Sequence, residues 1–146
     1  MAKFNFRLQG ILNIKQKLEE QEKIAYGLAK MQLETEEQRL AMLVKQREQL
    51  TEDKAELMSR SIKPHELNLY ENAISGVKAA IEEQKQVVIR ARREVELAQE
   101  RLDAAMKERK TYEKLREKAF DAFVEEQNYE EQLEINELVS YRHGRN

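Results

Sequence analysis

The sequence contains no cysteine and is poor in proline, glycine and aromatic residues, with one Pro, four Gly and no Trp among 146 residues. The absence of Cys excludes a disulfide framework and a thiolate metal site, and it fits a reducing compartment. No stretch approaches the roughly 20 apolar residues that a membrane-spanning helix needs. The opening residues 1–7 also lack the apolar run of a secretory signal. We therefore expect a soluble, cytoplasmic protein without a transmembrane segment.

Motifs of catalysis are missing as well. The sequence has no Gly-rich phosphate loop, no nucleophile elbow and no Cys/His metal spacing, and its two histidines, His65 and His143, are far apart in the chain. The basic run Arg90–Arg93 is followed by Glu94 and Glu96, which is more typical of a solvated ion-pair face than of a site for an acidic partner. With a net charge of −2, we predict no enzyme activity, no cofactor or metal, and no nucleic-acid partner.

Charged residues, in contrast, make up 37% of the chain, a composition typical of long helices. The second half also carries an apolar seam with a strict 3–4 spacing. The seam consists of Leu67, Tyr70, Ile74, Val77, Ile81, Val88, Ala91, Val95, Ala98, Leu102, Ala105, Tyr112, Ala119, Phe123 and Leu133. Its gaps are filled in register by Gln84, Arg109, Arg116, Glu126 and Glu130. A 3.5-residue repeat of this length predicts a coiled-coil helix.

One break interrupts the helical pattern, at residues 59–63 before Pro64. A residue that precedes proline is disfavoured in the α region, whereas proline itself suits the first turn of a helix. We therefore predict an all-α fold with a first helix over about 6–58, a turn over 59–63 and a second helix over about 64–141. The short connection makes the helices antiparallel neighbours, so that residues 1–146 form a single coiled-coil hairpin.

The seam of the first helix is less regular. Its apolar residues suggest a first stretch of Ile11, Ile14, Leu18, Gln21, Ala25 and Leu28. A second stretch follows as Leu33, Glu36, Leu40, Leu43, Arg47, Leu50, Lys54 and Leu57. The phase slips between Leu28 and Leu40, next to Gly27. Such a slip is typical of a stutter, which unwinds a supercoil locally.

Reflecting the chain about the turn places the aromatic residues of the two ends together. Phe4 and Phe6 come opposite residues 116–118, beside Tyr112, Phe120 and Phe123. The second helix then overhangs its partner from Asp121 to about Tyr141. The overhang carries the apolar residues Phe123, Val124, Tyr129, Leu133, Ile135, Leu138 and Val139. An unpartnered stripe of this kind indicates a binding surface or an oligomer contact; the alternative is a frayed tail.

Four blocks of the sequence resemble the family of the flagellar export protein FliJ. They are Phe4-x-Phe6-x-Leu8-Gln9-x-Ile11-Leu12-x-Ile14-Lys15, Leu69-Tyr70-Glu71-Asn72-Ala73-Ile74, the run from Tyr112 to Phe123, and Glu134-Ile135-Asn136-Glu137-Leu138. The order of the blocks and the chain length both fit, and the resemblance covers essentially the full length. The aromatic opening and the block Tyr-Glu-Lys-Leu-Arg-Glu-Lys-x-Phe are its discriminating parts, because periodicity alone is common to all coiled coils.

The resemblance implies a component of the flagellar type III export apparatus, with a two-stranded antiparallel coiled coil similar to the stalk subunit of rotary ATPases. It implies binding to the hexameric export ATPase FliI, a link to the membrane gate protein FlhA, and escort of export chaperones, at the inner face of the cell membrane. The ATPase contact would fall on Phe4, Phe6, Leu8, Arg116, Phe120, Phe123 and Val124. The gate contact would fall on Ala73, Val77, Ala80 and Gln84.

Two functions of other classes remain open from the residues themselves. The first is a homodimeric scaffold whose long helices pair between chains, for which the break before Pro64 has little use. The second is a general secretion chaperone that wraps unfolded cargo without the ATPase.

Overall fold

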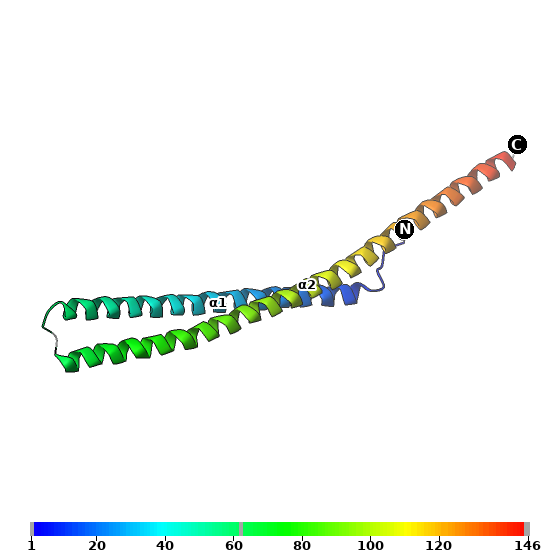
Figure 1. The fold of residues 1–146 in the computed structure, drawn as a ribbon. Coiled ribbons are helices and arrows are strands. Elements are labelled where there is room, and N and C mark those ends of the chain that lie inside the picture. Colours follow the sequence, from blue (N-terminus) through cyan, green and yellow to red (C-terminus); the bar gives the residue numbers. More distant parts are fainter. Residues whose placement is uncertain (1, 62, 145–146) are drawn as a thin grey trace. The chain divides into compact units, whose positions relative to one another are not determined.

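The computed structural model describes residues 2–61 and 63–144. It consists of two helices, α1 (Gln9–Met58) and α2 (Pro64–Gly144), and the described residues form no strand (Figure 1). This confirms the predicted all-α fold of two long helices packed against each other. α1 begins three residues later than predicted, at a turn in which the backbone N–H of Gln9 donates to the carbonyl of Phe6 (3.0 Å).

The connection between the helices follows from residues next to the break. The Ser59 hydroxyl donates to the Glu56 carbonyl (2.6 Å) and so satisfies one of the last carbonyls of α1. Pro64 is the first residue of α2, where its missing N–H costs no hydrogen bond. Ile62, which belongs to the predicted turn, lies outside the described residues.

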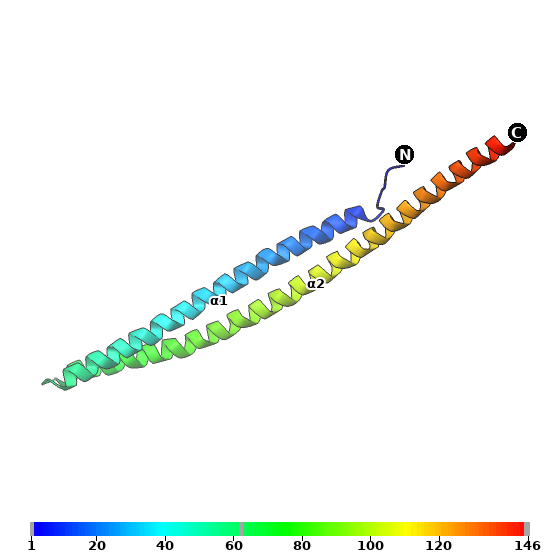
Figure 2. The same cartoon turned by 90° about the horizontal axis from the view of Figure 1, so that it is seen from above.

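Contacts within the chain define two compact units. The terminal unit comprises Met1–Gln21 and Asp103–Asn146, and the loop unit comprises Glu22–Leu102. Within each unit a stretch of α1 lies beside a stretch of α2 that runs in the opposite direction (Figures 1 and 2). The core is a narrow seam between two helices in both cases.

The predicted seam of α2 is confirmed. Ile81 and Ala98 are 1% exposed, and Val88 and Ala91 are also buried. Every other apolar member of the predicted seam is half-buried, apart from Leu133. Ala91 and Ala98 are buried at seam positions that are a multiple of seven apart, as the 3.5-residue repeat of a coiled coil requires.

The predicted seam of the early part of α1 is wrong. Leu12 is 2% exposed, whereas Ile11, Ile14 and Leu28 are 39%, 57% and 61% exposed. The residues that do face α2 keep a regular 3–4 spacing from the start of the helix. They are Leu12, Lys15, Glu19, Glu22, Tyr26, Ala29, Leu33, Glu36, Leu40, Leu43, Arg47, Leu50, Lys54 and Leu57. The 3.5-residue repeat is therefore unbroken and the predicted stutter is absent.

Several of the charged residues in this seam have a polar partner on α2. In the terminal unit, Lys15 pairs with Glu108 (2.8 Å), and the buried Glu19 accepts hydrogen bonds from Arg109. Arg109 also donates to Glu113 (2.8 Å). Hydrogen bonds to these two carboxylates raise the pKa of Arg109 further above its usual value, so the guanidinium stays charged. Ile11, Ile14 and Leu18 are thus left outside the seam.

A second polar layer lies in the loop unit. Glu36 is 3% exposed and accepts hydrogen bonds from Gln32 (2.9 Å), Arg39 (2.7 Å) and, across the seam, Gln84. Gln84 also donates to the backbone carbonyl of Glu36 (3.0 Å). No buried side-chain nitrogen or oxygen of the described residues lacks a hydrogen-bond partner. Such polar layers favour one register, because a shifted pairing would leave them unsatisfied in an apolar environment.

Candidate partner-binding surfaces

The terminal unit contains a cluster of aromatic residues from both ends of the chain. The ring of Phe4 packs edge-on against Phe120, with 5.2 Å between the ring centroids and 80° between their planes, and against Phe123 at 5.5 Å and 51°. The guanidinium of Arg116 lies 5.4 Å from the centroid of Phe4. We call Phe4, Arg116, Phe120 and Phe123 the terminal cluster. It has the geometry of favourable aromatic and cation–π contacts.

Local structure explains how the terminal cluster forms. Phe6, 8% exposed, anchors the segment before α1, whose helix starts at the turn between Phe6 and Gln9. On α2, Arg116, Phe120 and Phe123 are spaced by four and three residues and therefore lie on neighbouring positions of one side of the helix. Arg116 Nε donates to Gln9 Oε1 (2.9 Å), which fixes the first turn of α1 against α2.

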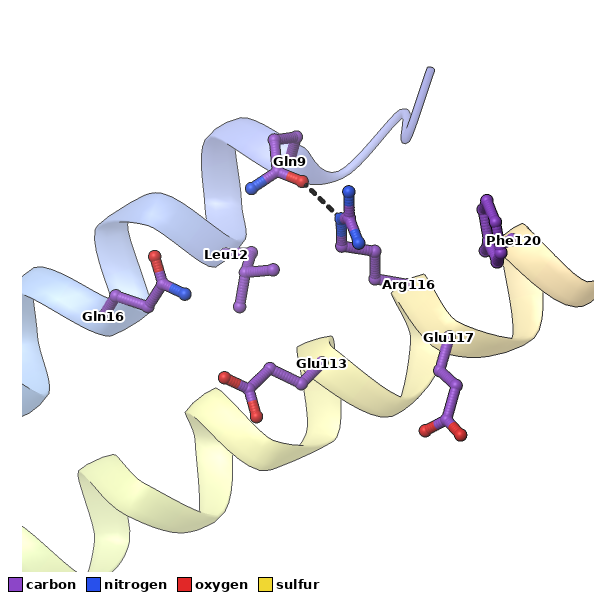
Figure 3. Close-up of a pocket in the computed structure, with 7 residues that line it drawn as sticks. All are labelled: Gln9, Leu12, Gln16, Glu113, Arg116, Glu117 and Phe120. Atoms are coloured by element: carbon purple, nitrogen blue, oxygen red, sulfur yellow. Dashed lines mark hydrogen bonds between the residues drawn. The ribbon is translucent and has the colours of Figure 1, made fainter. Parts of the chain in front are cut away.

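An open groove with a volume of about 540 Å³ lies next to the terminal cluster. Figure 3 shows α1 on one side of it and α2 on the other, with Leu12 between the two helices and Arg116 reaching toward Gln9. The lining residues are Gln9, Leu12, Gln16, Glu113, Arg116, Glu117 and Phe120. The lining combines hydrogen-bonding groups of both charges with the apolar side chains of Leu12 and Phe120, and the groove is open, which suits a protein contact better than the enclosure of a small molecule.

The predicted ATPase-contact residues gather in the terminal unit. Phe6 is buried and Leu8 is half-buried, so these two residues support the surface. Phe120 and Val124 remain 44% and 38% exposed. Arg116 is exposed as well. The exposed members of the predicted set thus lie within residues 116–124 of α2.

Beyond the terminal cluster, α2 continues past the start of α1 (Figures 1 and 2). From Val124 to Gly144 every residue except Gln127 is exposed, and the exposed apolar residues include Leu133 (44%), Ile135 (53%), Leu138 (63%) and Val139 (47%). The segment is helical to Gly144, three residues further than predicted.

Sequence reasoning missed the charge of this part of α2. Residues 121–141, here called the acidic segment, contain no Lys or Arg. Their acidic residues are Asp121, Glu125, Glu126, Glu130, Glu131, Glu134 and Glu137, which gives a net charge of −7. The signal is local and readable, but a whole-chain charge of −2 hides it.

The predicted gate-contact residues lie in the loop unit. Ala73 is exposed, whereas Val77 and Ala80 are half-buried on the side of α2 that faces α1. The side-chain amide of Gln84 is engaged with Glu36. The four residues thus lie along one stretch of helix but differ in accessibility.

We also searched the described residues for a metal site and for a membrane-spanning helix. No group of three or more His, Cys, Asp or Glu residues there could hold a metal ion. None of the described helices has a stretch long and apolar enough to cross a membrane.

The fold defines a two-helix coiled-coil protein, and its aromatic cluster and the acidic segment both lie in the terminal unit. The model of the family described as "Flagellar FliJ protein" matches residues 4–146. The chain belongs to this family. It is similar to the flagellar FliJ protein of Bacillus subtilis (strain 168), with 25% identity over 135 residues and 92% of each chain covered. Among solved structures it is similar to a YscO homolog from Chlamydia trachomatis, with a TM-score of 0.76, 17% identity, and 97% and 96% of the two chains covered.

Proposed function

We propose that this protein is a non-enzymatic component of the flagellar type III export apparatus and that it binds the hexameric export ATPase through its terminal unit. Membership of the FliJ family supports the place in the apparatus. The terminal cluster supports the site, because exposed Phe120 and Val124 lie next to a paired, internally fixed end. In this proposal the protein also links the ATPase to the membrane gate protein and escorts export chaperones, at the inner face of the membrane.

The proposed mechanism is mechanical. A single two-helix end inserted into a six-fold ring contacts the six subunits unequally. It therefore stabilises some subunit conformations more than others, and such differential contact is what couples binding to assembly and turnover of the ring.

The test uses the full-length chain and the FliI-like ATPase. Phe120→Ala with Phe123→Ala should reduce capture of the ATPase and its stimulation at least tenfold. The matched control is Leu69→Ala with Ile89→Ala, which removes two exposed apolar side chains of α2 that lie in the loop unit, outside the proposed contact. Full stimulation by a helical Phe120→Ala, Phe123→Ala variant, or equal loss with the control, would contradict the assignment of the site.

The proposed gate contact is a separate test. Ala73→Glu adds a charge at an exposed position, whereas Gln84→Ala mainly disturbs the seam through Glu36. We expect Ala73→Glu to weaken binding of the soluble part of the FlhA-like protein with no change in thermal stability. Unchanged binding would exclude this face of α2 as the gate contact.

A further inference from the structure

The terminal unit combines two surfaces of opposite charge, both with exposed apolar residues. The first is the acidic segment, with a net charge of −7. The second lies on the paired helices. Residues 2–18 contain Lys3, Arg7, Lys15 and Lys17 and no acidic residue, which gives +4. On α2, residues 107–118 contain six basic and three acidic residues, which gives +3.

The basic surface includes an apolar face that has been left out of the seam. Ile11, Ile14 and Leu18 are 39%, 57% and 40% exposed and follow one another at three and four residues. Ile11 and Leu18 lie about one turn before and one turn after Lys15 on α1. Because Lys15 pairs with Glu108, this apolar face lies next to the side of α2 that carries Glu108.

On α2, that side continues from Glu108 to Leu115, two turns further along, which is 41% exposed. Exposed lysines border this face: Lys17 on α1, and Lys114 and Lys118 on α2. Ile11, Ile14, Leu18 and Leu115, with these three lysines, are here called the basic face.

The acidic segment is complementary to the basic face in charge and also presents apolar residues. Val124, Ile135, Leu138 and Val139 lie close to one side of the helix, because spacings of 11, 14 and 15 residues are near whole numbers of turns. The segment is about 30 Å long at 1.5 Å per residue. It cannot reach the basic face of its own chain, since α2 is continuous through the segment and carries it past the start of α1 (Figure 2).

We propose that the acidic segment of one copy docks on the basic face of a second copy, and that the second copy returns the contact. The same two patches would be used twice in a closed, two-fold dimer, which is the commonest symmetry of homo-oligomers. The charge complementarity selects this occupant over an anionic membrane or nucleic acid, both of which the acidic segment repels. Each segment would lie parallel to α1 of the partner, so that each of the two overlaps becomes a short three-helix bundle of the segment with α1 and α2 of the partner. This inference does not rest on the proposed ATPase contact.

The first test is the mass of the full-length chain by sedimentation velocity over a range of concentrations. We expect about twice the mass of one chain in about 50 mM salt and dissociation in about 500 mM salt, where charges are screened within a few ångströms. Amide hydrogen exchange at low salt should show protection of residues 121–141 that increases with protein concentration. A single-chain mass under all conditions, or association without this protection, would overturn the proposal.

Charge reversal then identifies the surfaces. One variant carries Glu130→Lys, Glu134→Lys and Glu137→Lys, and the other carries Lys17→Glu, Lys114→Glu and Lys118→Glu. Each alone should be monomeric. An equimolar mixture should recover at least half of the wild-type association, because opposite charges again face each other.

The matched control reverses three exposed acidic residues of the loop unit, Glu48→Lys, Glu52→Lys and Glu83→Lys, and should dimerise as the wild type does. Failure of the mixture to associate, or equal loss in the control, would refute the pairing of these two surfaces.

Discussion

The phase of α1 in the terminal unit gives the sharpest prediction, because truncation of two apolar residues two positions apart should lower the stability by very different amounts. Leu12 is 2% exposed and Ile14 is 57% exposed. Leu12→Ala removes three carbon groups that are almost wholly hidden from water. At about 0.8 kcal/mol per buried CH₂ group, this loss alone is about 2.4 kcal/mol. Water can enter a seam one layer deep, so the cavity contributes little, and we expect Leu12→Ala to lower the free energy of unfolding by about 2–3 kcal/mol.

The same change at Ile14 removes side-chain atoms of which less than half are covered, a loss of about 1 kcal/mol. Alanine also has a better helix propensity than isoleucine, by about 0.4 kcal/mol, so we expect a net cost of about 0.5 kcal/mol. Ile14→Ala is therefore a matched control for Leu12→Ala.

The measurement is urea unfolding followed by far-ultraviolet circular dichroism, with amide exchange over residues 9–18 to confirm that the terminal unit is reported. A cost for Ile14→Ala equal to or above that for Leu12→Ala would show that the early part of α1 packs in the phase that its apolar residues suggest. The register described above would then be wrong.

Three further predictions concern the polar layers and the chain end. Gln84→Leu alone should lower the free energy of unfolding, because it removes a partner of the buried Glu36 carboxylate. The double variant with Glu36→Leu should instead raise the free energy of unfolding by about 1–4 kcal/mol, and a thermal melt of both variants checks this. Phe4→Ala should cost about 1–2 kcal/mol and speed amide exchange in residues 2–8, and unchanged exchange would contradict the anchoring role of its ring contacts. The hydrogen bond from Lys15 to Glu108 raises the pKa of Lys15 above 10.5. Its contribution to stability is therefore fully present below pH 10.5 and lost as the pH rises through the folded-state pKa, so Glu108→Gln should reduce the alkaline loss of stability in a pH titration of unfolding.

The two helices, their antiparallel pairing and the seam of α2 could be predicted because α2 keeps its apolar residues in register over many turns. The aromatic contact between Phe4 and Phe120 followed from the position of Pro64, since a reflection about the turn aligns the chain ends. The seam of early α1 could not be predicted in this way. Apolar periodicity selects Ile11 and Ile14, whereas the structure turns this stripe outward and places Lys15 and Glu19 against α2.

The candidate sites show the same division. The exposed end of α2 could be anticipated from its length, and its charge of −7 is a property of the sequence alone. The basic face could not be predicted from the sequence. Leu18 and Leu115 lie on different helices, and only the contact between Lys15 and Glu108 shows that the two residues are on the same side of the helix pair.

By itself, the sequence determined the helical content, the break before Pro64 and the repeat of α2. These features depend on local propensity and on an apolar period that is present within the sequence of a single helix. Only the tertiary structure decided the phase of α1 and which apolar residues stay exposed. The physical reason is that a charged residue can occupy a seam when its counter-charge arrives from the other helix, as Arg109 does for Glu19. That partner is about 90 residues away in the chain, beyond the reach of any local pattern.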